Sequence, residues 1–201
     1  KEGEAPVPPS AASCPFSVSR RGFVVSEGAG CIVIASRAFV AAHGLAFEAE
    51  LAGWAMTADA CHVVAPNPVT VTRCMAESIR HAGISPAEID AVNAHAASTK
   101  VGDQVEAEAL REIFGDRIPP VSANKSQLGH AMGATSAVES ILALEGLRRG
   151  VLLPTINHRP DPAIEMDCVS EMARRVNQEY VLKNAFGFGG CNACLVFRRV
   201  N

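Results

Sequence analysis

The sequence predicts an α/β fold, because short apolar strands alternate along it with longer helical segments. An apolar strand at residues 89–92 precedes an amphipathic helix at 103–114. A short strand at 120–123 then precedes the longest helix, at 129–149. Near the end of the chain, two further strands flank the glycine-rich turn at 186–190, so we expect the sheet to contain a hairpin as well.

The start of the chain predicts another hairpin. β-Branched and aromatic residues cluster at 22–26, and residues 31–35 are apolar throughout, as in a buried strand. The glycine-bearing segment 27–30 makes the turn between them. Residues 37–43 follow as a short helix, which Gly44 ends.

A half-buried strand, a loop and a helix come next. Period-two alternation begins the segment 47–54, which is typical of a strand with one buried face. Two prolines keep residues 59–68 non-helical, and apolar residues then recur at helical spacing over 71–82. Residues 85–88 match a capping box with proline at the first helical position, which predicts a brief helical turn.

The two long helices have distinct predicted faces. The helix at 103–114 places apolar residues on a buried face and glutamates away from it: Val105, Ala109 and Ile113 against Glu106, Glu108 and Glu112. Small residues fill the first half of the helix at 129–149, which lets a neighbouring backbone approach closely. Ile141, Leu144 and Leu147 continue its buried face.

The closing hairpin joins strands at 180–184 and 193–199 and repeats the pattern of the first one. Both consist of a strand, a glycine-rich turn and a buried strand, which indicates an internal duplication. We therefore expect residues 1–46 to be the end of a first half and residues 47–201 to form a complete second half.

Composition narrows the class of protein. The 201 residues are 48% hydrophobic without an apolar run near the ~18 residues of a membrane span, so we expect a globular protein with no membrane span. A net charge of −3 without a basic patch disfavours nucleic acid as a partner. The first ten residues are polar and resemble neither a signal nor a transit peptide, which fits a surface loop in the later part of a longer protein.

The cysteines indicate a reducing compartment. There are seven, widely spread, which suits free thiols and a cytoplasmic protein better than a disulfide framework. Cys191 and Cys194 have the spacing of a metal or redox pair. No second pair lies at ligand spacing, so we expect no metal site.

Residues suited to chemistry gather at the ends of two predicted strands. His95 follows the strand at 89–92, while Lys125 and His130 follow the strand at 120–123. In α/β sheets, ligands bind at the carboxyl ends of strands, and helix N-termini favour anions. Two imidazoles and an ammonium at such an edge would form a pocket for a carboxylate or a developing oxyanion.

Five motifs cover nearly the whole chain in a distinctive order. They are Gly22-Phe23-Val24 with Glu27-Gly28-Ala29-Gly30, Asn93-Ala94-His95 with Ser98-Thr99 and Gly102-Asp103, Lys125-Ser126 with Gly129-His130, Pro154-Thr155-Ile156-Asn157, and Asn184 with Phe186-Gly187-Phe188-Gly189-Gly190. In order and spacing they resemble the C-terminal portion of β-ketoacyl-acyl-carrier-protein synthases, the condensing enzymes of the thiolase-like superfamily.

The resemblance implies a thiolase-like αβαβα layered fold of two related halves, of which this chain would hold the end of the first and the complete second. The implied reaction is decarboxylative Claisen condensation of malonyl-carrier protein with an acyl-enzyme thioester, in fatty-acid or polyketide chain elongation. The nucleophilic cysteine is expected in an N-terminal half that this chain lacks. Implied partners are that half, an acyl carrier protein whose phosphopantetheine carries the substrates, and a second subunit in a homodimer or ketosynthase heterodimer; the chain itself would bind no cofactor.

The resemblance also assigns roles to individual residues. By position, His95 and His130 resemble the catalytic histidine pair, and Lys125 resembles the lysine that orients the second histidine and supports the charge balance. Glu139 resembles an acid that anchors this network, and we expect Asp103 to support it.

The glycine-rich turn resembles the family's gate at the acyl pocket. By position, Phe188 resembles the gating residue, with Phe186 beside it, and the backbone N–H of Phe188 would contribute to an oxyanion hole. Gly187 and Gly189 allow this turn to move.

Other positions resemble the pantetheine channel and a second gating loop. Ala97 stands where the family commonly has a threonine that contacts the pantetheine arm, and Thr99 and Val64 belong to the same channel. Asp59 and His62 lie in the second gating loop, where His62 is as compatible with a structural role as with gating.

Two other functions remain open from the sequence. The chain could be a non-catalytic, chain-length-factor-like partner of a ketosynthase, although such partners commonly lose the histidines that this chain retains. The residue at the nucleophile elbow of the first half would discriminate between this partner and a catalytic synthase. A thiolase acting on coenzyme A esters is disfavoured, because the chain has paired histidines rather than a histidine with a second cysteine.

Overall fold

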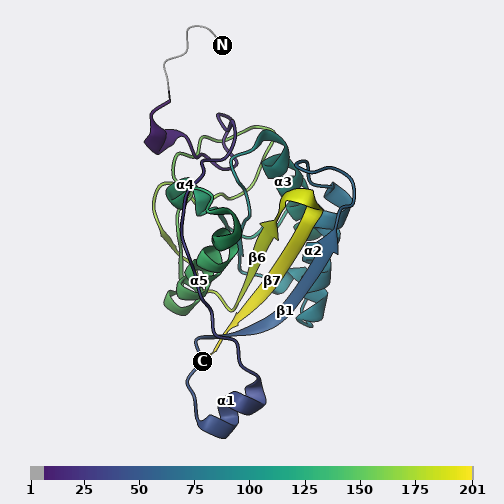
Figure 1. Cartoon of the computed structure of the whole chain (residues 1–201), viewed down its shortest axis with the longest axis vertical. Coiled ribbons are helices and arrows are strands. Elements are labelled where there is room, and N and C mark those ends of the chain that lie inside the picture. Colours follow the sequence, from purple (N-terminus) through teal and green to yellow (C-terminus); the bar gives the residue numbers. More distant parts are fainter. Residues whose placement is uncertain (1–6, 201) are drawn as a thin grey trace.

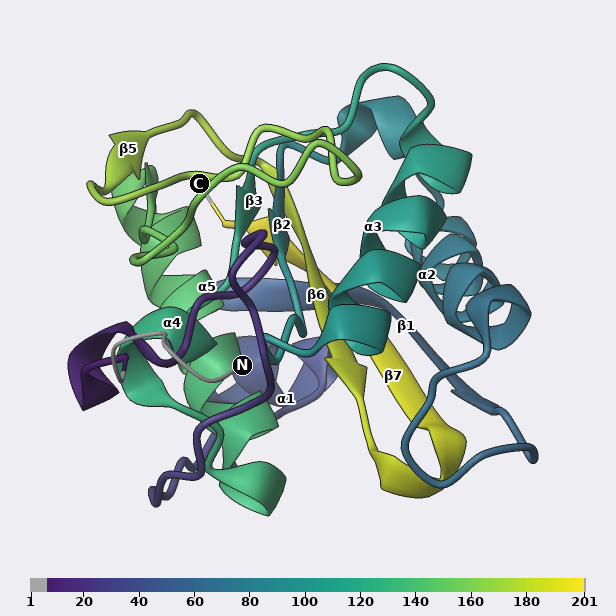
Figure 2. The same cartoon turned by 90° about the horizontal axis from the view of Figure 1, so that it is seen from above.

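The computed structural model describes residues 7–200 and shows a three-layered α/β arrangement. A five-stranded mixed sheet has the order β1-β7-β6-β2-β3. Helices α2 and α3 cover one face of the sheet, and α5 covers the other (Figure 1, Figure 2). The predicted α/β class is confirmed. The sequence-based expectation of a surface loop at the start falls partly on residues 1–6, which lie outside the described residues.

The elements have the following bounds. The strands are β1 (Ala49–Ala58), β2 (Ala91–Asn93), β3 (Val121–Ser122), β6 (Tyr180–Phe186) and β7 (Cys191–Arg199), and a separate pair comprises β4 (Val151–Leu152) and β5 (Arg174–Arg175). The helices are α1 (Arg37–His43), α2 (Pro68–His81), α3 (Lys100–Phe114), α4 (Lys125–Leu128) and α5 (Thr135–Arg149). Single 3₁₀ turns are η1 (Pro9–Ala11), η2 (Pro86–Glu88), η3 (Met132–Ala134) and η4 (Phe188–Gly190).

Strand direction gathers three chain segments at one edge of the sheet. Strand β2 pairs in parallel with both β3 and β6, while β7 is antiparallel to β6 and to β1. The carboxyl ends of β2, β3 and β6 therefore point the same way. The residues that follow these three strands meet at that edge, which is where open α/β sheets bind ligands.

Local signals explain the helix boundaries. Helix α2 begins at Pro68, earlier than the predicted 71–82, because the Asn67 side chain accepts a hydrogen bond from the Val69 N–H at 3.0 Å. The capping box at 85–88 is confirmed, since the Glu88 carboxylate accepts from the Ser85 N–H at 2.8 Å. The closing hairpin of β6 and β7 is also confirmed.

The predicted helix at 129–149 is wrong in its first part. Helix α4 ends at Leu128, and α5 begins only at Thr135. Between them, Gly129 has a φ of +69°, and the His130 N–H donates to the Val24 carbonyl at 2.7 Å. This long-range bridge to residues 24–26 replaces the helical bonds that the local sequence favours.

The buried face of α5 also differs from the prediction. Leu147 is buried as expected, but Ile141 is 38% exposed, and the buried positions include Glu139 and Ser140. The close approach predicted for the small residues does occur. A Cβ on Gly30 would lie 3.0 Å from the Ala137 Cβ, so the backbone near Gly30 lies directly on α5.

The predicted hairpin at 22–35 is wrong. Residues 22–35 form no strand, and their one ladder contact is the bridge between Val25 and His130. Val33 is 91% exposed and Ile34 is 76% exposed, because no strand among the described residues pairs with this apolar segment. Helix α1 ends at Gly44 as predicted, but it projects from the body of the molecule (Figure 1). The duplication and the boundary at residue 46 stay predictions.

Within residues 7–200, none of the helices has the length and apolar character needed to cross a bilayer.

Gly53 gives a direct test of the packing between β1 and α2. A Cβ at this position would lie 2.3 Å from the Ser78 carbonyl oxygen and 2.6 Å from the Ala82 nitrogen. We expect Gly53→Ala to lower the free energy of unfolding by about 1–3 kcal/mol through overpacking. The matched control is Gly133→Ala, where no atom lies within 4 Å of the added Cβ. Denaturant titration measures both, and equal midpoints for Gly53→Ala and the parent would refute this packing.

Candidate active site

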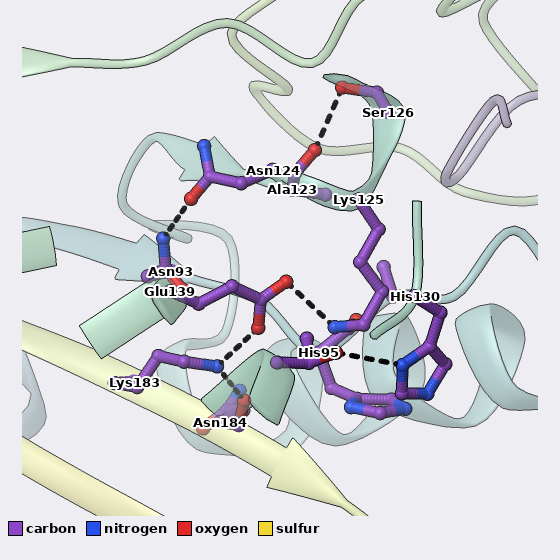
Figure 3. A network of polar contacts seen from close by, with 12 residues as sticks. Asn93, His95, Ala123, Asn124, Lys125, Ser126, His130, Glu139, Lys183 and Asn184 are labelled. Atoms are coloured by element: carbon purple, nitrogen blue, oxygen red, sulfur yellow. Dashed lines mark hydrogen bonds and ion pairs between the residues drawn. The ribbon is translucent and has the colours of Figure 1, made fainter. Parts of the chain in front are cut away.

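Two histidines meet at the carboxyl edge of the sheet. His95 follows β2, and His130 follows α4, and their ring centroids lie 5.7 Å apart at an interplanar angle of 77° (Figure 3). Aromatic rings flank the pair. The ring centroids of Phe186 and His95 lie 5.5 Å apart, and those of Phe23 and His130 lie 5.6 Å apart. Both imidazoles are half-buried, so the pair is open to a substrate while being shielded from bulk water.

Lys125 contacts the first of these histidines. Its ammonium lies 2.8 Å from the Glu139 Oε1 and also donates to the His95 carbonyl oxygen (Figure 3). The side chains of Lys125 and Glu139 are 1% and 2% exposed. The resemblance implied that this lysine orients the second histidine. In the structure its hydrogen bonds instead hold the main chain at His95, the first histidine.

The hydrogen bonds of His130 determine which ring nitrogen bears the proton in its neutral form. The Met132 N–H donates to the His130 Nδ1 at 3.2 Å, and the Thr135 hydroxyl lies 3.0 Å from the same atom. A backbone N–H can only donate, so Nδ1 acts as the acceptor. The neutral ring therefore bears its proton on Nε2.

Burial and nearby ammonium groups keep both imidazoles neutral. Desolvation, followed by the charges of Lys125 and Lys183, holds the pKa of His95 well below its ordinary value. Desolvation and Lys125 also lower the pKa of His130. At neutral pH the pair thus offers hydrogen-bond donors rather than two cations.

Glu106 is a site residue that sequence reasoning placed wrongly on the outer face of α3. It is buried, and its carboxylate accepts from the His95 N–H at 2.9 Å, from the Ala96 N–H at 2.7 Å and from the Asn184 amide at 2.9 Å. Desolvation raises its pKa despite these donors. The sequence did contain a signal, because the spacing of Asp103, Glu106 and Leu110 places them on one face of a helix. In the structure this face is buried.

Lys183 is a second residue that the sequence analysis missed. It lies on β6 and is 1% exposed, and its ammonium is 2.9 Å from the Glu139 Oε2. It also donates to the Asn184 carbonyl oxygen. The sequence signal was a pair of polar residues, Lys183 and Asn184, within an otherwise apolar strand. No local pattern could show that the partner of Lys183 lies on α5.

Asp103 does not join the network of Lys125 and Glu139. Its carboxylate accepts from the Phe16 N–H at 2.8 Å and from the Thr99 N–H at 3.0 Å, so it fastens the N-terminal segment to the start of α3. Burial raises its pKa to about 6. Thr99 caps the same helix, with its hydroxyl accepting from the Gly102 N–H.

The two predicted gating loops lie together. The Asp59 N–H donates to the Gly190 carbonyl at 2.9 Å, and the Gly189 N–H donates to the Val63 carbonyl at 2.8 Å. Asp59 is buried, and a Cβ on Gly190 would lie 2.3 Å from the Asp59 Cβ, so only glycine fits there. Phe188, at the tip of this turn, is 55% exposed, and its ring lies 6.1 Å from that of Phe23.

The remaining predicted positions are less directly connected to the histidines. His62 Nδ1 accepts from the Val64 and Ala65 N–H groups at 3.0 and 2.9 Å, which favours a structural role within its own loop. Val64 is 62% exposed, whereas Ala97 is buried beside the His95 segment. The Gly187 N–H donates to the Cys191 carbonyl at 2.8 Å, which closes the turn. Within residues 7–200, no group of three His, Cys, Asp or Glu side chains is arranged to hold a metal ion.

Glu106→Gln tests whether this carboxylate positions His95. A glutamine keeps one oxygen, so one buried backbone N–H would face an amide NH₂ and lose its acceptor. We expect a loss of about 1–3 kcal/mol in the free energy of unfolding. Glu108→Gln, on the exposed face of the same helix, is the control and should be neutral. Denaturant titration of both variants decides it, and equal stability would contradict the positioning role.

Comparisons with known proteins identify the family of the chain. A family model described as "Beta-ketoacyl synthase, C-terminal domain" matches residues 48–159. The chain is 39% identical over 197 residues to 3-oxoacyl-[acyl-carrier-protein] synthase 2 of Coxiella burnetii, which covers 96% of this chain and 48% of that protein. The chain thus spans about half the length of the curated relatives it matches.

Solved structures share the fold closely. A type II PKS acyl-carrier protein in complex with its ketosynthase (AntDE:AntF) matches with a TM-score of 0.91 and 32% identity, covering 96% of this chain and 48% of that one. The ishigamide ketosynthase/chain length factor matches with a TM-score of 0.91 and 36% identity, covering 94% and 47%. The thiolase-like fold expected from the motifs is the fold of these ketosynthases. The chain therefore belongs to the β-ketoacyl synthase family and contains its C-terminal domain.

Proposed function

We propose that this chain supplies the malonyl-activating half of a β-ketoacyl-[acyl-carrier-protein] synthase. The observation that supports this most is the pair of half-buried imidazoles, His95 and His130, at the sheet edge, together with the buried Lys125–Glu139 ion pair that holds the His95 main chain. The reaction is decarboxylative Claisen condensation, which extends an acyl chain in fatty-acid or polyketide synthesis.

The chemistry suits two neutral donors. Loss of CO₂ from a malonyl thioester leaves an enolate, whose charge collects on the thioester oxygen. Imidazole N–H groups directed at that oxygen stabilise it in a site with little water. The enolate carbon then attacks the acyl thioester on the enzyme, the new C–C bond forms, and the C–S bond breaks to release the cysteine thiolate.

The cysteine nucleophile belongs, in this proposal, to the N-terminal half of the synthase. The seven cysteines of this chain are all free, which supports a reducing, cytoplasmic setting. We further propose an acyl carrier protein as the donor of substrates on its phosphopantetheine, and assembly as a homodimer or a ketosynthase heterodimer. The similarity to a ketosynthase in complex with its acyl-carrier protein supports the carrier.

A second candidate is a non-catalytic partner resembling a chain-length factor. The observation that favours it is Ala97, which is buried beside His95 and offers no hydroxyl to a pantetheine arm. The similarity to a ketosynthase/chain length factor is compatible with either role. Intact His95, Lys125 and His130 favour the catalytic role.

His95→Ala tests the condensing activity. Removing one of two donors to the enolate should lower the rate of condensation by about 10²-fold or more in the assembled protein. His43→Ala, on the exposed helix α1, is the matched control and should leave the rate unchanged. Carrier-bound β-ketoacyl product is measured by mass spectrometry, and an undiminished rate in His95→Ala would refute the role of this histidine.

Acylation distinguishes the enzyme from the non-catalytic partner. The assembled protein is incubated with an acyl-carrier or acyl-coenzyme A donor, and the intact mass of each chain is measured by mass spectrometry. We expect one acyl adduct on a cysteine of the N-terminal half, outside the 201 residues of this chain. A protein that forms no adduct on any chain would favour the chain-length-factor reading.

A further inference from the structure

We propose that Lys183 is a positioning residue for the condensation, which gives the buried cluster of Lys125, Glu139 and Lys183 a net positive charge and thereby keeps His95 and His130 neutral. This inference rests on the proposed function of the two histidines. It assigns a role to a residue that none of the sequence motifs includes.

The geometry of the cluster is symmetrical about Glu139. Its Oε1 lies 2.8 Å from the Lys125 ammonium, and its Oε2 lies 2.9 Å from the Lys183 ammonium (Figure 3). The three side chains come from α4, α5 and β6 and are at most 2% exposed. One carboxylate therefore pairs with two buried ammonium groups, and the three groups together bear one surplus positive charge.

Lys183 also lies between the two supports of His95. One support is Glu139 with Lys125, whose ammonium donates to the His95 carbonyl. The other is Glu106, which accepts from the His95 N–H and from the Asn184 side chain. Because the Lys183 ammonium bonds both Glu139 and the Asn184 carbonyl, it connects the two supports.

A surplus positive charge here favours neutral imidazoles. Lys183 lowers the pKa of His95 and of His130, in addition to the larger effects of burial and Lys125. The other charged or titratable groups that face the cluster are Glu106 of α3 and Cys194 of β7. Without Lys183, Glu139 and Lys125 would form a neutral pair, and protonation of the histidines would be less opposed.

The hydrogen bonds of His130 need that neutral form. Its Nδ1 accepts from the Met132 N–H, so a proton on Nδ1 would set two donors against each other. Protonation would thus displace the ring from the place where its Nε2–H can serve an enolate oxygen. Lys183 opposes this displacement without touching the ring.

The experiment changes the charge of the cluster. Lys183→Met removes the surplus charge, whereas Lys183→Arg keeps a cation beside Glu139. Lys100→Met, at an exposed lysine of α3, is the control. The pKa values of His95 and His130 are measured by NMR titration of the assembled protein that contains this chain, and the pH profile of condensation is recorded in parallel.

We expect both histidine pKa values to rise in Lys183→Met, and to stay near the parent values in Lys183→Arg. The acidic limb of the pH profile should move to higher pH in Lys183→Met only, and Lys100→Met should change neither. Unchanged histidine pKa values in Lys183→Met would overturn the proposal, as would an equal rise in Lys183→Arg.

Folding and function can be separated in this design. If Lys183→Met does not fold, Lys183→Gln removes the same charge while its amide NH₂ can still donate to Glu139 and to the Asn184 carbonyl. It must then raise both histidine pKa values, and unchanged values would refute the proposal. The titration needs no turnover, so a protein with the expected shifts but no condensation would refute only the proposed function.

Discussion

The carboxylate of Glu139 is the group on which the buried charges of the site depend. It binds one buried ammonium with each oxygen, and the pull of Lys183 and Lys125 outweighs desolvation and lowers its pKa. A lone charge in this position would be strongly unfavourable, so the three groups must be built in together. Through Lys125, the ion pair reaches the main chain of His95, and the position of the first histidine follows from it.

The second histidine depends on the N-terminal segment rather than on the ion pairs. The His130 N–H donates to the Val24 carbonyl, and the Ser26 N–H donates to the His130 carbonyl at 3.0 Å. This bridge needs glycine at position 129, because the φ there is +69° and a Cβ would lie 2.9 Å from the Val24 oxygen. The segment also places the Phe23 ring between His130 and Phe188. Residues near 24 are thus part of the site, although they form no regular element.

The two halves of the polar network serve different purposes. Glu106 fixes the direction of the His95 main chain with two backbone hydrogen bonds, and such bonds are costly to lose when buried. The lysines and Glu139 set the electric field at the imidazoles. For the proposed condensation, a site built this way would hold its donors in place before the substrate arrives, so that formation of the enolate would need little reorganisation.

Local periodicity was sufficient to predict most of the regular elements. Helices α2 and α3, the capping box at 85–88 and the hairpin of β6 and β7 all follow from spacing, prolines and glycines. It failed for the segment 22–35, because a buried strand needs a partner that local sequence does not show. It also failed at 129–134, where one long-range bridge replaced helical bonds.

The sequence by itself determined the α/β class, the family motifs and the identities of His95, Lys125, His130 and Glu139. Only the tertiary structure decided that Glu106 faces inward and that Lys183 shares Glu139 with Lys125. It also showed that Asp103 serves the N-terminal segment instead of the histidines. The physical reason is that a buried charge is stabilised by partners distant in sequence, and no pattern of neighbouring residues specifies which ones they are.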